Sequence, residues 1–417
     1  MKLRCLLPAL GLVVMAAAQA DDGAELTLRA DQHTASMQGP LAAADVLQPG
    51  VAPPPPSSAR LQLELRQSLR LVGAVSLSGN VLLAHERQAG GAGQDHSRVN
   101  ELVVGVDGGA WQWTAGRKVL GWDVGYAFRP NDVVQQEVRR TQLGQTSQGR
   151  PLLQLEHFGD DRALALVLVH PQHLGRDAAS SRGAEEAALA ARIYGRLGAL
   201  DLHGFARQGR HTGASAGAAL SWVASDAVEL HASARAFQRH DGWSLAADTA
   251  DAAVRANPWQ QASLPGGTQW LVGGQWTGGP QLNLLVEAWH DGTALSDAAW
   301  RDWGTRNAAL ARLATQGPQR AAAAGNLAWQ AAPFDSASLR RDNLFLRLAW
   351  QPVDWTVSVD ALLTPADRGH VFTAAVQWKG ERWRLDASWR VFGGPAAALY
   401  SQLPSRRSAL LAATWAF

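Results

Sequence analysis

The sequence predicts an all-β fold: a transmembrane, antiparallel, up-and-down β-barrel of about 16 strands, with 14 to 18 as the range. Segments of about ten residues alternate apolar and polar side chains. The chain holds 18 tryptophans, many of them beside expected turns. No stretch after residue 20 has 18 consecutive apolar residues. A membrane-spanning backbone without helices must be a closed barrel, because every amide in the hydrocarbon needs a partner.

The first twenty residues have the pattern of a secretory signal peptide. Lys2 and Arg4 precede the apolar run 6–18, and Ala18-Gln19-Ala20 forms a small-residue cleavage site. We therefore expect residues 1–20 to be removed. Cys5, the one cysteine of the sequence, lies in this peptide. The mature chain is then expected to lack disulfides and cysteine ligands.

Charge and motifs exclude several classes of function. The full chain has 38 Lys and Arg against 36 Asp and Glu, and loss of Lys2 and Arg4 leaves the mature chain formally neutral. A neutral chain argues against nucleic acid as a partner. The sequence contains no His-Glu-x-x-His or phosphate-loop pattern. We expect no catalytic residues, no metal site and no cofactor.

Composition divides the remaining chain into two parts. Residues 21–59 are polar, alanine-rich and end in the proline run 53–56, which is typical of a periplasmic leader or linker, in part disordered. Residues 60–417 are expected to form the barrel. Between Leu61 and Leu83 the alternation fits either one very long strand or a strand that follows a short extended arm.

The expected strands give an even number, which places both termini on the periplasmic side. Long extracellular connections are expected near 119–149, 171–186, 240–266, 291–340 and 392–406. Within the longest, residues 296–315 have helical spacing and Ser296 as a cap, which predicts a surface helix or, less favoured, a lid. The strands are 72–87, 97–107, 110–118, 151–158, 162–170, 187–197, 199–209, 213–223, 227–239, 267–277, 281–290, 341–351, 354–363, 369–379, 382–391 and 407–417.

The parity of each strand assigns its side chains to lipid or to the lumen. A soluble β-sandwich also alternates, but its tryptophans would have no reason to collect at one rim. Predicted membrane-interface residues are Trp111, Trp222, Trp276, Trp350, Trp355, Trp378, Trp383 and Trp415. Predicted lumen residues are Glu156, Arg192, Arg196, Asp201, Glu229, Arg235, Arg239, Glu287, Arg347, Asp360, Arg384, Asp386 and Arg390. Their mixed signs fit either a transverse field across a pore or a salt-bridged, closed lumen.

The segment 116–140 is the most distinctive. It leaves the third expected strand and is rich in aromatic and charged residues. One interpretation is a loop folded into the lumen; the other is an extracellular loop held to the rim by Trp122, Tyr126 and Phe128. In the first case the pore-constriction candidates are Arg117, Lys118, Asp123, Arg129, Asp132, Arg139 and Arg140.

Two features resemble known families. The run Gly116-Arg117-Lys118 through Trp122, followed by Phe128-Arg129-Pro130-Asn131-Asp132, is similar to porin-like Gram-negative outer-membrane barrels of the alginate-export type and to related uncharacterised proteobacterial barrels. In those families the strand ends in Gly-Arg-Gln or Gly-Lys-Gln and the turn is of the Asn-Pro-x-Asp type. The alternating strand 408–417 that ends in Phe417 resembles the signal read by the barrel-assembly machinery.

The resemblance implies an outer-membrane location, with outer-membrane lipid, the assembly machinery and a small polar solute as partners. The favoured hypothesis is a channel for diffusion or export of a small or linear polar solute, with an anionic solute as one form of it, gated by a loop in the lumen. The alternatives are a closed structural or binding barrel with a partner-binding extracellular surface, and a barrel hydrolase.

Overall fold

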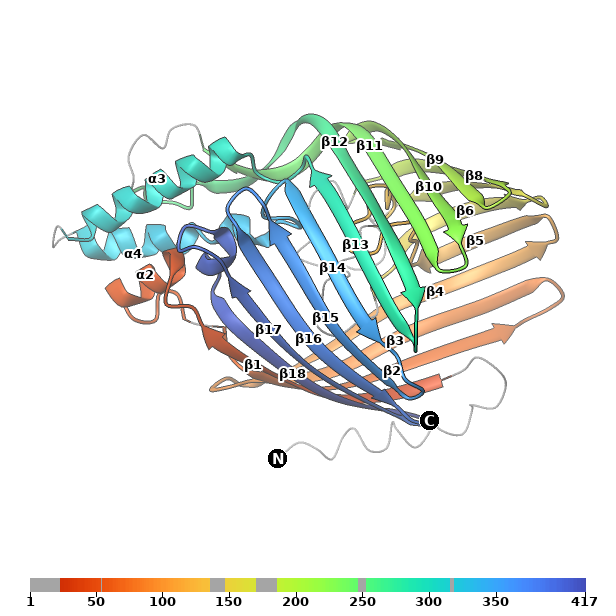
Figure 1. The fold of residues 1–417 in the computed structure, drawn as a ribbon, viewed down its shortest axis with the longest axis horizontal. Coiled ribbons are helices and arrows are strands. Elements are labelled where there is room, and N and C mark those ends of the chain that lie inside the picture. The colour runs from red at the N-terminus through yellow and green to blue at the C-terminus, as the bar shows by residue number, and fades with distance from the viewer. Residues whose placement is uncertain (1–22, 54, 136–146, 170–185, 247–252, 316–318) are drawn as a thin grey trace.

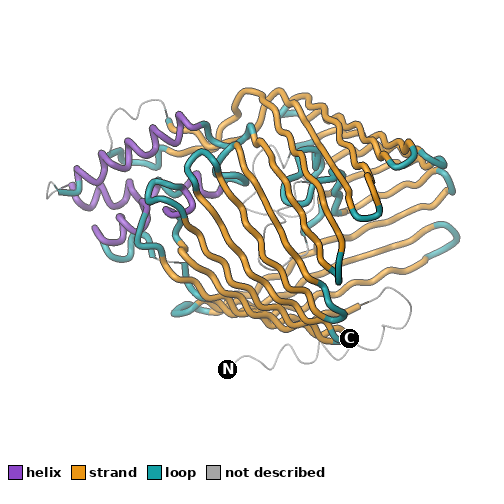
Figure 2. The backbone as a smooth tube through the Cα atoms, in the orientation of Figure 1, coloured by secondary structure: helices purple, strands orange, loops and turns teal. Residues whose placement is uncertain are grey.

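Among the described residues, 23–53, 55–135, 147–169, 186–246, 253–315 and 319–417, eighteen antiparallel strands form one closed sheet in a computed structural model (Figures 1 and 2). The strands are β1 (Gly23–Ala35), β2 (Ser58–Arg70), β3 (Val75–Gln88), β4 (Gly93–Gly108), β5 (Trp111–Lys118), β6 (Arg150–Phe158), β7 (Arg162–Val169), β8 (Ala188–Leu197), β9 (Leu200–Gly209), β10 (Gly213–Ser225), β11 (Val228–Leu245), β12 (Trp259–Gly278), β13 (Leu282–Asp291), β14 (Asp342–Trp350), β15 (Trp355–Thr364), β16 (Gly369–Lys379), β17 (Trp383–Gly393) and β18 (Ser405–Ala416). β1 pairs with both β2 and β18, so no sheet edge is left open.

The predicted fold class is confirmed, but the barrel has two more strands than the predicted sixteen. Residues 21–59 were expected to precede the barrel, whereas Gly23–Ala35 form β1 within it. The turn at 71–74, with Gly73 at φ +57°, separates β2 from β3. Odd-numbered residues face outward in both strands, so the alternation continued across this turn and concealed it. The expected signal peptide, 1–20, lies outside the described residues.

Short turns lie at one end of the barrel and longer connections at the other, as predicted. The expected loop at 240–266 is mostly wrong, because β11 continues to Leu245 and β12 begins at Trp259. The run Pro265-Gly266-Gly267 is typical of a turn, yet it lies inside β12. Pairing with β11 overrides this local preference.

Three helices lie together beyond the long-connection end of the strands (Figure 1). They are α2 (Gly39–Leu47), α3 (Asp297–Leu313) and α4 (Arg320–Trp329). Two 3-10 turns also occur: η5 (Ala332–Asp335) between α4 and β14, and η6 (Leu399–Gln402) between β17 and β18. The predicted helix at 296–315 is confirmed as α3, with the Ser296 hydroxyl accepting from the Ala299 amide. Leu310 and Leu327 are buried where α3, α4 and α2 meet. No helix among the described residues has the length and apolarity to span a membrane.

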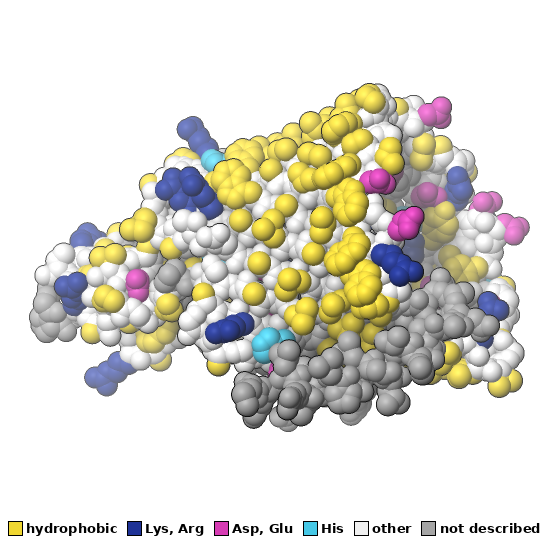
Figure 3. Space-filling model, turned by 90° about the horizontal axis from the view of Figure 1, so that it is seen from below, with side chains coloured by type: hydrophobic (Ala, Val, Ile, Leu, Met, Phe, Trp, Pro, Cys, Tyr) yellow, Lys and Arg dark blue, Asp and Glu magenta, His cyan; other side chains and the backbone are white. Residues whose placement is uncertain are grey.

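The outer face of the barrel is apolar. On β14, Leu348 and Trp350 are exposed, whereas the alternate residues Phe345 and Ala349 are buried inside. The space-filling view shows hydrophobic side chains spread over the outside of the strands (Figure 3). The tryptophans named above lie toward the short-turn end of their strands, and most are about half exposed. A continuous exposed apolar surface of this kind requires a lipid environment.

Candidate functional site

Residues 119–135, here called the inner segment, leave β5 and cross the lumen. The Asn131 side-chain amide donates to Ser233 Oγ on β11 at 2.8 Å and to the Ala234 carbonyl at 3.1 Å. It also donates to the Ala218 carbonyl on β10 at 3.3 Å. Ser233 has inward parity, so the inner segment lies inside the barrel. Of the two arrangements predicted for the segment 116–140, a loop folded into the lumen and an extracellular loop held to the rim, residues 119–135 adopt the first.

Gly217 on β10 explains how Asn131 comes so near to the wall. A Cβ at Gly217 would overlap Asn131 Oδ1 and would lie 2.5 Å from the Ala234 carbonyl oxygen. Only a residue without a side chain leaves this space. The contact therefore depends on one glycine in the strand and one amide in the segment.

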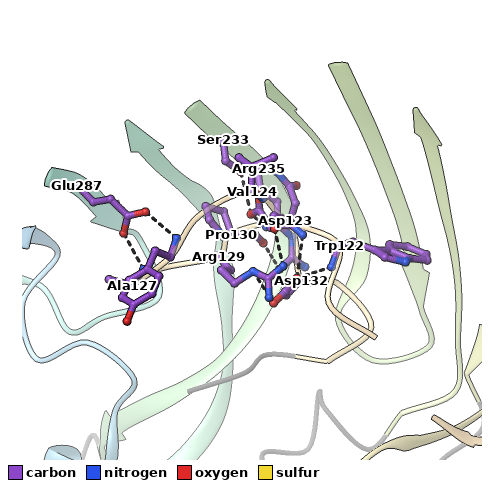
Figure 4. A network of polar contacts seen from close by, with 12 residues as sticks. Trp122, Asp123, Val124, Ala127, Arg129, Pro130, Asp132, Ser233, Arg235 and Glu287 are labelled. Carbon is purple, nitrogen blue, oxygen red and sulfur yellow. Dashed lines mark hydrogen bonds and ion pairs between the residues drawn. The ribbon is translucent and has the colours of Figure 1, made fainter. Parts of the chain in front are cut away.

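Glu287 on β13 holds the inner segment at a second place. Its carboxylate accepts the backbone N–H of Tyr126 at 2.6 Å and of Ala127 at 2.7 Å, and His231 Nε2 lies 2.9 Å from it (Figure 4). Glu287 is fully buried. A buried carboxylate with several hydrogen-bond donors is a strong anchor for a loop.

Asp123 and Asp132 fold the inner segment onto itself (Figure 4). Asp132 Oδ1 accepts from the amides of Trp122 and Asp123, and Arg129 Nε lies 3.2 Å from Asp132 Oδ2. Asp123 Oδ2 accepts hydrogen bonds from the backbone N–H of Asn131 and from the Ser233 hydroxyl. Burial raises the pKa of Asp123 and raises that of Asp132 to about 6, although Arg129 and the amides act in the opposite direction.

Apolar packing completes the attachment. Leu120, Trp122 and Val133 pack with inward residues of β6–β10, including Val167 and Phe205. Farther along, Phe128 stacks on Trp289 of β13 with ring centroids 5.6 Å apart. The inward side chains of β6–β13 along the inner segment are consequently almost all buried.

The opposite part of the wall, β14–β18 with β1–β5, is here called the free wall. Most of its inward charged side chains are partly exposed, although Glu64 and Arg117 are buried; the side chains of Arg347 and Asp360 are 25% and 20% exposed. The inner segment reaches this wall at β14, where Tyr126 stacks on Phe345 and its ring centroid lies 5.6 Å from Arg347 Cζ. The barrel interior therefore has one side on which the inner segment packs and, beyond Tyr126, a second side lined by partly exposed charges. The second side is the candidate solute path.

The residues predicted to form a pore constriction lie in different surroundings. Asp123, Arg129 and Asp132 lie in the internal network of the inner segment. Arg117 is buried and donates to the Gly149 carbonyl, and Lys118 Nζ donates to Gln154 Oε1 at 3.0 Å. Arg139 and Arg140 lie outside the described residues. That these side chains line a constriction stays a prediction.

The lumen candidates all have inward parity, but they fall on both sides. The free wall carries Arg347, Asp360, Arg384, Asp386 and Arg390. On β8–β11 lie Arg192, Arg196, Asp201, Glu229 and Arg235. Of these, Arg235 contacts the Pro130 carbonyl of the inner segment at 3.4 Å. Arg196 is exposed and the other four are partly exposed, as are the five on the free wall.

The predicted lumen residues did not include the inward charges of β1 and β2, because β1 was assigned to the leader and β2 was not separated from β3. They are Glu25, Arg29, Asp31, Arg60, Glu64 and Arg66. A signal was present: Leu26 and Leu28 alternate with Glu25, Thr27 and Arg29 over five residues. It is shorter than the alternation from Leu61 onward.

Comparisons with known proteins agree with this architecture at the level of the fold. No protein-family model matches the chain, and a search of curated proteins finds no match. Solved structures with the same fold include OccAB1 of Acinetobacter baumannii, with a TM-score of 0.53 and 10% identity, covering 95% of this chain and 96% of that chain. OccK5 (OpdH) of Pseudomonas aeruginosa has a TM-score of 0.53 and 10% identity, covering 95% of this chain and 98% of that chain. OccK11 (OpdR) of Pseudomonas aeruginosa has a TM-score of 0.52 and 9% identity, covering 95% of this chain and 96% of that chain.

The closed sheet, its apolar exterior and its polar interior define a transmembrane β-barrel of the outer-membrane class. The chain is a β-barrel of the bacterial outer membrane with the fold of these solved structures, as the sequence predicted. The narrower resemblance to alginate-export-type barrels stays a prediction.

Proposed function

We propose that the chain is a channel through which small polar solutes diffuse across the outer membrane, and that the inner segment narrows and gates it. The observation that carries the proposal is the contrast between the two sides of the lumen. The inner segment packs on inward apolar side chains such as Val167 and Phe205, while the free wall keeps charged side chains such as Arg347 and Asp360 partly exposed.

Eighteen strands also give room for such a path. Barrels of about 16 to 18 strands enclose an aqueous channel, whereas eight-stranded ones are filled by their side chains. Among the described residues, the inner segment packs mainly on one side of this wide barrel. The finer statement, that the solute is anionic, has no support in the sign of the free wall, which carries both charges.

Planar-bilayer recording of the purified protein tests the channel. We expect stepwise ion conductance, together with uptake of small polar solutes into liposomes that contain the protein. Failure of both measurements would contradict the proposal and favour the closed barrel with a partner-binding surface. Serine-reagent-sensitive hydrolysis would favour the hydrolase instead.

Gating is tested by tying the inner segment to the wall. In the double variant Asn131→Cys, Ser233→Cys two thiols replace the hydrogen-bonded side chains of the inner segment and β11, and thiol titration after oxidation verifies that they form a disulfide. We expect oxidation to remove opening and closing transitions and reduction to restore them. The two single-cysteine variants are the controls. Transitions that persist unchanged in the oxidised protein would show that the segment does not gate.

A further inference from the structure

The charged side chains of the free wall come in pairs of opposite sign. On β14 and β15, Arg347 Nη1 lies 3.2 Å from Asp360. The other pairs are Arg384 with Asp386 at 3.2 Å, Arg29 with Asp31 at 2.6 Å, Arg60 with Glu86 at 3.9 Å, and Arg66 with Glu64 at 2.8 Å and Glu25 at 3.4 Å. These pairs lie on β14–β15, on β17 and on β1–β3, so they occur around the whole free wall.

The arginine of each pair is partly exposed, while the acids Glu64, Asp386 and Asp31 are 6%, 11% and 12% exposed. Arg66 is 47% exposed at its side chain and Arg384 is 34% exposed. Lys118 and Arg390 donate hydrogen bonds to Gln154 and Thr373 and keep their positive charge, and the charge of Arg390 also acts on Asp360. A solute passing along the free wall therefore meets closely spaced charges of both signs and no continuous row of one sign.

Paired charges treat ions and dipoles differently. The attraction of an anion to Arg347 is largely cancelled by Asp360 beside it, and the same holds for a cation with the signs exchanged. A solute that carries an ammonium and a carboxylate on one small frame can place each group against the opposite member of a pair. Such contacts favour the zwitterion over either single ion.

On this basis we propose that the channel prefers net-neutral, zwitterionic solutes of amino-acid type over anions or cations of the same size. The inference rests on the proposed channel function and specifies its substrate class. Glu86 and Asp360 are its specificity-determining acids, because each offsets an arginine on a neighbouring strand.

Three probes of nearly equal size test it: glycine as the zwitterion, glycolate as the anion and ethanolamine as the cation. Uptake into liposomes with the wild-type protein at neutral pH is expected to be fastest for glycine. In a salt gradient, the cation and anion permeabilities of the wild type should agree within about threefold. Glycolate uptake faster than glycine uptake, or strong selectivity for one ion sign, would overturn the inference while leaving a working channel.

Two variants expose single arginines. Asp360→Asn leaves Arg347 without its acid and Glu86→Gln does the same for Arg60, so each should raise the anion-to-cation permeability ratio by about two- to fivefold and speed glycolate relative to glycine. Asp354→Asn, an exposed position in the turn before β15, removes the same charge outside the lumen and is the matched control. An unchanged ratio in both lumen variants would overturn the inference. A complete lack of conductance in every protein would overturn the channel as well.

Discussion

Glu287 Oε1 accepts the backbone N–H of Tyr126 at 2.6 Å, across 161 positions of sequence. Glu287 lies on β13 of the barrel wall and Tyr126 lies in the inner segment, so this hydrogen bond attaches the segment to the wall. Together with the bond to Ala127, it places a buried negative charge where two backbone donors converge.

Glu287→Gln tests this anchor. The amide keeps the shape of the side chain but turns one acceptor into a donor that faces backbone N–H groups. Because hydrogen bonds to a charged acceptor contribute about 1.5–3 kcal/mol, we expect spontaneous transitions of the inner segment to become at least about tenfold more frequent in single-channel records. Glu229→Gln, whose carboxylate accepts from Ser221 on the neighbouring strand, is the control. Identical records for the two variants would count against the anchor.

Gly217→Ala tests the second attachment. The added methyl group would overlap Asn131, so the segment must move away from β10 or its hydrogen bonds to Ser233 and Ala234 must break. We expect a changed conductance and easier protease cleavage within the segment. Gly195→Ala on β8 adds the same methyl group where no atom lies within 4 Å, and it should behave as the wild type. The idea fails if both alanine variants behave alike.

Attachment of the inner segment should depend on pH through Asp132. Burial raises the pKa of this carboxyl from 3.8 to about 6 in the docked segment. Between pH 3.8 and about 6, Asp132 is protonated in the docked state and deprotonated in the released state. Docking is therefore strongest at low pH and weakens as pH rises through this range. The full difference is about 3 kcal/mol.

Channel records at pH 5 and pH 7.5 measure this effect. More frequent release of the segment is expected at pH 7.5, and Asp132→Asn should flatten the dependence because its amide does not titrate. More frequent release at the lower pH, or an unchanged pH profile in the variant, would show that another group controls docking.

The outward, lipid-facing side chains of the barrel allow a further prediction about stability. Val359 points outward at the middle of β15 and is 52% exposed. An arginine at this depth should lower the free energy of unfolding by about 2–4 kcal/mol, because the charge enters hydrocarbon. Val353→Arg, in the exposed turn that precedes β15, should change it little. Denaturant unfolding from lipid vesicles compares the two, and equal losses would mean that Val359 does not face lipid.

The sequence by itself determined the fold class and most of its elements. Alternation identified β3–β18, and it also placed Leu348 outside and Arg347 inside, because a strand turns successive side chains to opposite faces. Helix α3 was predicted from its spacing and from Ser296. These features depend on residues a few positions apart, which is why local patterns disclose them.

Only the tertiary structure decided how the barrel closes and which wall the inner segment occupies. β1 becomes a barrel strand by pairing with β18, nearly four hundred residues away, and its short alternation gave no sign of that partner. Asn131 finds Ser233, and Tyr126 finds Glu287, across 102 and 161 positions. A local pattern fixes which face a side chain takes, but the partner it meets there depends on closure of the whole sheet.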